Sequence, residues 1–289
     1  MAKKLAVLAT HGMGTGSDKF DDAILAYLKK NVDPTIWPDV AWVPVVWEDV
    51  LDDRQNKLAD RLKKTGHDWS KLRGFVIEYL SDVAAYQFYG MGNRARYKKS
   101  AYYQINRKFY EALEASRKLG DIDDDTHFIG ISSSLGCHIL SNYMWDMTHD
   151  TSRVVDGRDR LDEVHCVKKI AGLYFAGCNI PILNMGFEGA DHIPIQFPGS
   201  KKARDVKSEW LNIYDPDDVL GYPLRHHYQG YYNGLSQTKS KKVTRVKDVK
   251  INSGGLLSWS PMSHTAYWKD RDYQSRLKKG IEKIYKSLP

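Results

Sequence analysis

Short, continuous apolar runs recur along the chain of 289 residues, and segments with helical spacing separate them. An uninterrupted run of this kind is typical of a strand that is buried on both faces, as in a parallel sheet. The predicted strands are Lys4–Thr10, Val40–Trp47, Thr126–Ser132, Lys169–Cys178, Glu209–Tyr214 and Val243–Ile251. The predicted helices include Ser17–Asn31, with Ser17 as its cap, Leu135–Thr148 and Ala266–Ser287. Strands that alternate with helices predict an α/β fold with a mostly parallel central sheet and helices on both faces.

The interval 48–125 is too long for a single crossover helix, which needs about 15–30 residues. Helices are predicted there at roughly 49–64, 70–89 and 98–119, and the interval is rich in tyrosine and basic residues. We therefore expect a helical insertion at about 48–120, either as a lid over the carboxyl edge of the sheet or as helices on its flank. The sequence has no internal repeat or low-complexity linker, so residues 1–289 are expected to form a single domain.

Composition and targeting signals narrow the class of protein. No run of 18 or more apolar residues is present to span a bilayer, and the apolar run after Met1 is shorter than the core of a secretory signal. Three cysteines are too few for a disulfide framework and lack the spacing of metal ligands. We therefore expect a cytoplasmic protein. The net charge of +7 is compatible with binding to an anionic partner.

The segment Gly130–Gly136 joins a predicted strand to a predicted helix. A nucleophile in such a sharp turn needs small residues two positions before and after it, and Ser132 and Gly136 have this spacing around Ser134. The usual first residue is glycine, so Ser132 departs from the pattern while remaining small. The following helix N-terminus favours a developing negative charge. Ser134 is the candidate nucleophile, and packing or hydrogen-bonding roles are expected for Ser132 and Ser133.

A glycine-rich turn, His11-Gly12-Met13-Gly14, follows the first predicted strand. Glycines let a backbone approach a substrate closely, so the amide of Met13 would bind a carbonyl oxygen, with the amide of Leu135 as its partner. We expect Gly12, Met13 and Leu135 to form an oxyanion site, and a purely structural turn is the alternative. A phosphate-binding loop is excluded because neither the GxxxxGK[ST] pattern nor the dinucleotide fingerprint matches.

Histidine is the usual general base near neutral pH, and His264 is the candidate. It lies in a loop between the last predicted strand and the last predicted helix, where the base belongs in a Ser–Asp–His chain order. His11 is expected to be structural. The neighbouring pair His226-His227 lacks an evident third ligand, so we expect no metal and no cofactor.

The acid of a triad orients the imidazole and stabilises its positive form. It is expected in the loop after Glu209–Tyr214, which offers Asp215, Asp217 and Asp218. Asp215 precedes a proline, and such an aspartate more often shapes a turn.

These features together resemble the α/β-hydrolase superfamily, and in particular its compact lipases and esterases. The matching segments, which lie outside 48–125 and span most of the remaining chain, are His11-Gly12-Met13-Gly14, Ser132-x-Ser134-x-Gly136, Gly177–Pro181, Asp217-x-Val219 and Ser263-His264. The resemblance implies an α/β-hydrolase fold. It also selects Asp217 as the acid, because this loop often reads Asp-x-Val in the family, and Asp218 is the alternative.

The expected function is that of a serine hydrolase, which would cleave an ester or related acyl bond of a small-molecule or lipid-like substrate through Ser134, Asp217 and His264. Thioesterases, peptidases, amidases and acyltransferases share this machinery, so these residues do not decide which kind of acyl bond is cleaved. The alternative is a non-catalytic binding protein that holds an anionic partner on the basic stretches Tyr89–Arg107 and Lys239–Lys242. A solvated surface is the favoured interpretation of both stretches, so nucleic acid is not expected, while peripheral membrane contact stays open.

Overall fold

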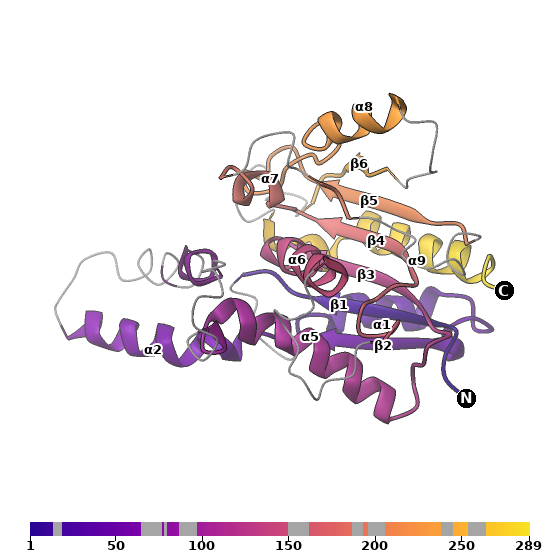
Figure 1. Ribbon diagram of the computed structural model, residues 1–289, viewed down its shortest axis with the longest axis horizontal. Coiled ribbons are helices and arrows are strands. Elements are labelled where there is room, and N and C mark those ends of the chain that lie inside the picture. Colours follow the sequence, from indigo (N-terminus) through magenta and orange to yellow (C-terminus); the bar gives the residue numbers. More distant parts are fainter. Residues whose placement is uncertain are drawn as a thin grey trace.

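A parallel sheet forms the centre of the protein (Figure 1). The computed structural model describes residues 1–13, 19–64, 77, 80–86, 97–149, 162–186, 193–195, 206–237, 245–253 and 264–289. In these residues the strands are β1 (Leu5–Thr10), β2 (Val40–Val45), β3 (His127–Ser133), β4 (Ile170–Ala176), β5 (Glu209–Tyr214) and β6 (Lys247–Lys250). Their spatial order is β2-β1-β3-β4-β5-β6, and each pair of neighbours is parallel. The predicted α/β fold with a parallel central sheet is confirmed.

The six predicted strands match the six strands of this sheet, with small shifts at their ends. The largest difference is at the predicted strand Val243–Ile251, of which residues 243 and 244 lie outside the described residues; in the rest, β6 pairs with β5 from Lys247 to Lys250. β6 lies at one edge of the sheet. Its lysines suit that position, because charged side chains keep an edge strand from pairing with another chain.

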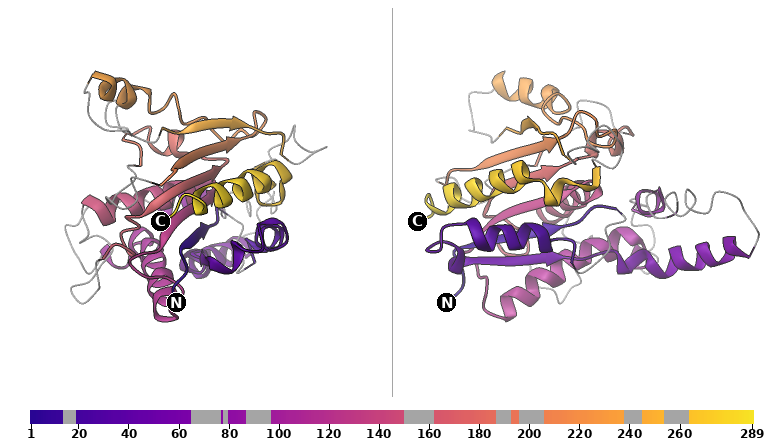
Figure 2. Two further views of the ribbon diagram at one scale, coloured as in Figure 1. Left: turned by 90° about the vertical axis from the view of Figure 1, so that its right-hand side faces the viewer. Right: turned by 180° about the vertical axis from the view of Figure 1, so that it is seen from behind.

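Each face of the sheet carries its own hydrophobic core. On β1, Ala6 and Leu8 belong to one core, while Leu5, Val7 and Ala9 belong to the other. Burial on both faces explains why this strand is a continuous apolar run. The first core is covered by α5 (Ala101–Lys118) and α6 (Leu135–His149), and the second by α1 (Asp22–Asn31) and α9 (Arg271–Tyr285) (Figure 2).

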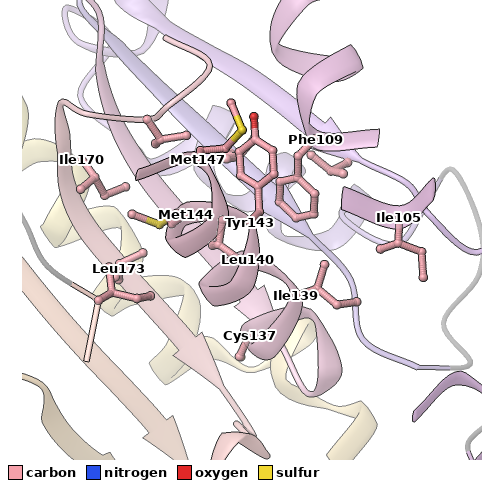
Figure 3. Close-up of a cluster of buried hydrophobic side chains, with 14 of the residues drawn as sticks. Ile105, Phe109, Cys137, Ile139, Leu140, Tyr143, Met144, Met147, Ile170 and Leu173 are labelled. Carbon is pink, nitrogen blue, oxygen red and sulfur yellow. The ribbon is translucent and has the colours of Figure 1, made fainter. Parts of the chain in front are cut away.

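Aromatic packing fixes α6 against α5 and the sheet. The rings of Phe109 on α5 and Tyr143 on α6 stack with centroids 5.0 Å apart, and the Tyr143 hydroxyl donates to the carbonyl oxygen of His165 at 2.7 Å. Figure 3 shows these rings in one cluster with Leu140 of α6 and Leu173 of β4. The N-terminus of α6, which follows β3 directly, is therefore held by a close-packed core rather than by local contacts alone.

The interval between β2 and β3 holds helices, as predicted. They include α2 (Asp49–Lys63) and α5, and residues 80–85 are also helical. α5 packs against β2 and α6, so this part of the insertion covers the flank of the sheet. α2 contacts α5 and extends beyond the end of the sheet toward which β4 and β5 run (Figure 1).

Several helix boundaries differ from the prediction. The predicted cap of the first helix, Ser17, lies outside the described residues, and α1 begins at Asp22. The predicted continuous helix Ala266–Ser287 is wrong, because Asp270 is extended and divides it into η7 (Tyr267–Lys269) and α9. The Asp270 carboxylate accepts the N–H of Tyr273 at 2.9 Å and so caps α9. Three further short helical segments were not predicted: η1 (Trp37–Asp39), α7 (Ile180–Leu183) and α8 (Gln229–Gln237).

Candidate active site

Ser134 lies in the turn between β3 and α6, at the carboxyl end of a central strand. Its φ of 52° is a left-handed backbone conformation, which costs a residue other than glycine on the order of 1–3 kcal/mol. The Ser134 N–H donates to the carbonyl oxygen of Ala176 in β4 at 2.9 Å, which helps to hold the turn. The strained strand-to-helix turn predicted from the small residues around Ser134 is therefore present.

The loop after β1 packs directly on this turn. A Cβ atom at Gly12 would lie 2.6 Å from the Cβ of Ser134, and one at Gly136 would lie 2.3 Å from the carbonyl oxygen of His11. Both distances are far below van der Waals contact, so a side chain at either position would push the loop and the turn apart. Ser132 is fully buried and fits the other small position of the turn.

Ser134 and His264 form a hydrogen-bonded pair across 130 residues of sequence. The Nε2 of His264 lies 2.7 Å from the Oγ of Ser134, and both side chains are buried. On the other side of the ring, Nδ1 lies 2.8 Å from Oδ2 and 3.0 Å from Oδ1 of Asp218. With an N–H at Nδ1, the ring donates to the carboxylate and leaves Nε2 to accept the serine proton.

The carboxylate against His264 belongs to Asp218, and the prediction of Asp217 for this position is wrong. Asp217 is exposed, and its N–H donates to Oδ1 of Asp215 at 2.9 Å. In the same turn, the Asp218 N–H donates to the carbonyl oxygen of Asp215 at 3.1 Å, and the Asp218 side chain is buried. The turn therefore directs residue 218 toward the site and residue 217 toward solvent.

Asp218 is held in its ionised form. Burial by itself raises the pKa of a carboxyl group, but hydrogen bonds from His264, from the N–H of Leu220 and from the hydroxyl of Tyr267 outweigh it and leave the pKa of Asp218 below its usual value. The Leu220 N–H donates to Oδ1 at 2.9 Å, and the Tyr267 hydroxyl donates to Oδ2 at 2.8 Å. Asp218 is thus a negative charge at neutral pH, as the stabiliser of an imidazolium must be.

His11 is a structural residue of the loop after β1. Its Nδ1–H donates to the carbonyl oxygen of Gly12 at 2.8 Å, and its Nε2 accepts the N–H of Trp47 at 3.1 Å. The ring also stacks on the Trp47 indole with centroids 4.6 Å apart. Burial lowers the pKa of His11 from 6.5 to about 4, so the ring is neutral at pH 7 and Nε2 keeps its acceptor role.

We expect the free energy of unfolding to decrease as the pH falls from about 6.5 toward 4. In this range His11 binds a proton in the unfolded chain but not in the folded protein. The contribution of His11 to the free energy of unfolding is therefore fully present above pH 6.5 and is lost progressively below it. At about 1.4 kcal/mol per pH unit, the loss from this residue between pH 6.5 and 5 is about 2 kcal/mol. Urea unfolding at pH 7 and pH 5 measures the change.

The matched control is His11→Gln, which cannot be protonated in this range. Its loss of stability between pH 7 and pH 5 should be smaller than that of the wild type by about the same 2 kcal/mol. Equal losses in the two proteins would show that His11 does not titrate on unfolding.

Two backbone amides adjoin Ser134 in sequence or in space. Leu135 is the first residue of α6, and Met13 lies in the loop whose Gly12 touches the Ser134 side chain. Within the part of the chain that the structure describes, no acceptor receives either N–H. The first N–H groups of a helix have no partner inside it, so such amides are available to a ligand oxygen. The predicted neighbours Gly14 and Ser263 lie outside the described residues.

The remaining candidates are placed as follows. Gly177, with a φ of 54°, opens the loop after β4 that ends in α7. His227 contacts the ring of Tyr228.

In the described residues no group of three or more His, Cys, Asp or Glu side chains is arranged to hold a metal ion. The free and buried cysteines are Cys137, Cys166 and Cys178. No helix in these parts of the chain is both long and apolar enough to cross a membrane.

Two residues that contact the site escaped the sequence analysis. Tyr267 and Trp268 follow His264 closely in the chain and donate hydrogen bonds to Asp218 and to Ser133, respectively. The sequence signal is an aromatic pair in a segment that carries the candidate base, and aromatic pairs are also ordinary constituents of hydrophobic cores.

No protein-family model and no curated protein sequence matches the chain. Among solved structures, carboxyl esterase 2 of the mycorrhizal fungus Tuber melanosporum is similar at 12% identity and a TM-score of 0.45, over 99% of this chain and 80% of that chain. Esterase B of Lactobacillus rhamnosis, in a structure with a C4-C4 SN3 tributyrin phosphonate, has 11% identity and a TM-score of 0.46, over 99% of this chain and 77% of that chain.

The arrangement of the chain itself identifies the type of fold. The candidate nucleophile lies on a turn between a central parallel strand and a helix, and Ser134, Asp218 and His264 follow one another in that order along the sequence. With helices on both faces of the parallel sheet, this is an α/β-hydrolase-like fold.

Proposed function

We propose that this protein is a serine hydrolase that cleaves an ester or related acyl bond through an acyl-enzyme. The observation that carries the proposal is the continuous chain of hydrogen bonds from Ser134 through His264 to Asp218, with distances of 2.7 and 2.8 Å. A hydroxyl group is a weak nucleophile by itself, and an adjacent base that is oriented by a carboxylate is the arrangement that activates it.

In the proposed reaction, the Oγ of Ser134 attacks the acyl carbon while its proton passes to Nε2 of His264. The negative charge of Asp218 stabilises the imidazolium that forms. When the tetrahedral intermediate collapses, the imidazolium returns this proton to the leaving alcohol, and the acyl group remains on Ser134. Water then attacks the acyl-enzyme with His264 as the base, which releases the acid and restores the serine hydroxyl.

The amides of Met13 and Leu135 are proposed to bind the oxyanion of each tetrahedral intermediate. The contact between Gly12 and Ser134 brings the two loops together, and the N-terminus of α6 adds a favourable dipole. Donors that are fixed before the reaction stabilise the developing charge without reorganisation, and in many enzymes this stabilisation accounts for most of the rate enhancement.

The surroundings of the site support a substrate with an apolar acyl portion. Large apolar side chains are exposed in the segments that follow β4 and β5: Ile182, Met185 and Val219. The carboxyl ends of parallel strands meet at one edge of the sheet, so these segments begin at the edge that carries Ser134. If these segments contact the substrate, their exposed apolar side chains favour an aliphatic acyl group over a charged one.

Hydrolysis of p-nitrophenyl acetate, butyrate and hexanoate tests this proposal. The wild type should release p-nitrophenolate from each ester, with a rapid initial burst wherever deacylation is slow. The ratio kcat/KM should rise from acetate to hexanoate, because the longer chain buries more apolar surface. Absence of hydrolysis for all three esters, together with no reaction toward a fluorophosphonate probe, would count against a serine hydrolase.

The alternative of a non-catalytic binding protein has less support. In the described part of Tyr89–Arg107, Tyr97 is buried and the guanidinium of Arg107 lies 4.4 Å from the ring centre of Tyr110. These two side chains pack on the protein, whereas Lys99 of the same stretch is exposed. The run Lys239–Lys242 lies outside the described residues. Binding to anionic vesicles that survives Ser134→Ala would favour this alternative.

A further inference from the structure

Tyr267 contacts two residues of the turn that carries the candidate acid. It lies in η7, which begins shortly after His264, and its side chain is almost fully buried. Its hydroxyl donates to Oδ2 of Asp218 at 2.8 Å, and the hydroxyl oxygen accepts the N–H of Asp215 at 2.9 Å. The hydroxyl is therefore satisfied both as donor and as acceptor, which sets its direction.

The neighbouring residue, Trp268, reaches the other end of the site. Its indole N–H donates at 2.9 Å to the Oγ of Ser133, the residue directly before the candidate nucleophile. The rings of Trp268 and Phe20 make a T-shaped contact. One short helix thus contacts both the acid segment and the turn that carries Ser134. Of these two contacts, the one with Asp218 involves a member of the hydrogen-bonded series Ser134–His264–Asp218.

The Asp218 carboxylate is held from three directions. Leu220 donates to Oδ1, Tyr267 donates to Oδ2, and the His264 ring lies against both oxygens. A backbone N–H on one oxygen alone would let the carboxylate rotate about its Cβ–Cγ bond, whereas a second donor on the other oxygen fixes its plane. The orientation of the imidazole follows from the orientation of this carboxylate.

We propose that Tyr267 is a positioning residue of the catalytic site, which acts through Asp218 by fixing the carboxylate plane and thereby the His264 ring. This proposal rests on the proposed function as a serine hydrolase. Tyr267 does not touch the substrate, so its removal should affect the chemical step and leave substrate binding unchanged.

The pH dependence provides a readout that a merely structural role would not move. The Tyr267 hydroxyl is one of the groups that hold the pKa of Asp218 below its usual value, so its removal raises that pKa. The acid limb of the kcat/KM profile follows protonation of the base, His264. A carboxylate that has lost one of its hydrogen-bond donors stabilises the imidazolium more strongly, so this limb should move to higher pH.

The test compares Tyr267→Phe with Tyr273→Phe. Tyr273 is also fully buried, but its hydroxyl donates to the carbonyl oxygen of Tyr174 at 3.1 Å, away from the triad. In Tyr267→Phe, kcat for p-nitrophenyl butyrate should fall about tenfold with KM unchanged, as expected for the loss of one hydrogen bond to a charged group. In Tyr273→Phe, kcat and the pH profile should stay at wild-type values. Thermal unfolding establishes that both variants fold.

A wild-type kcat and pH profile in Tyr267→Phe would overturn the proposal, and so would equal losses in the two variants. The proton resonance of the His264 Nδ1–H separates this result from failure of the proposed function. If Tyr267 positions the ring, this resonance shifts in Tyr267→Phe and not in Tyr273→Phe, even if the protein hydrolyses no ester. An unchanged resonance in Tyr267→Phe would contradict the positioning role directly.

Discussion

The variant Ser134→Ala is expected to lower kcat toward p-nitrophenyl butyrate by about 10⁶-fold, to the level that substrate binding and the oxyanion amides can supply alone. The substitution removes the Oγ that lies 2.7 Å from Nε2 of His264, and no acyl-enzyme can then form. Alanine keeps the Cβ atom that packs near Gly12, so the turn should remain folded. Steady-state kinetics and a thermal unfolding curve measure both effects.

Ser132→Ala is the matched control for this experiment. Ser132 lies two residues before Ser134 and is fully buried, and its Oγ has no hydrogen-bond partner within the described parts of the chain. Removing a buried and unsatisfied hydroxyl is nearly neutral or slightly stabilising, so this variant should keep activity within about threefold of the wild type. The assignment of the nucleophile is wrong if Ser134→Ala retains activity comparable to that of Ser132→Ala.

The second large effect is expected at the acid. In Asp218→Asn, kcat should fall by about 10⁴-fold, because an amide cannot stabilise the imidazolium and its NH₂ group can favour the wrong tautomer of His264. Asp218 is buried against His264, Leu220 and Tyr267, so the substitution removes a buried negative charge beside the imidazole. Measurement of kcat and KM for the three p-nitrophenyl esters checks this prediction.

Asp217→Asn is the control, and the contrast between the two neighbours is the informative result. Asp217 is exposed, and the hydrogen bond that it makes through its N–H is kept by asparagine. Its kcat should stay within about twofold of the wild type, as is usual for a surface substitution. A greater loss in Asp217→Asn than in Asp218→Asn would contradict the geometry of the site.

The sheet and two members of the candidate triad were predictable because each depends on local sequence. The strands are apolar runs, and their burial on both faces of the sheet leaves little room for polar residues. Ser134 is marked by its small neighbours at the end of such a run, since only small residues let the loop after β1 approach the turn. His264 is marked by its place after the last strand.

The acid could not be chosen from sequence because Asp217 and Asp218 are adjacent, and a family-like spacing selects the wrong one. Which carboxylate faces inward is decided by the turn that begins at Asp215. Oδ2 of Asp215 accepts the N–H and the hydroxyl of Ser253, and this contact spans 38 residues of sequence. A contact between residues so far apart in the sequence leaves no pattern in the residues around Asp217 and Asp218.

The helix boundary in the C-terminal region could not be predicted from local sequence either. The sequence predicts a single helix over Ala266–Ser287. The break instead depends on an aspartate that caps α9 and on two aromatic side chains that turn back toward the site. In α8, Gly230 and Gly234 weaken the helical signal, because glycine is a poor helix former.

The most direct test of the central claim is to locate the covalent adduct of a fluorophosphonate probe by mass spectrometry after proteolysis. The wild type should carry one phosphonyl group on Ser134, whereas Ser134→Ala should not be labelled and Ser132→Ala should be labelled like the wild type. A label on another serine, or equal labelling of Ser134→Ala, would contradict the account.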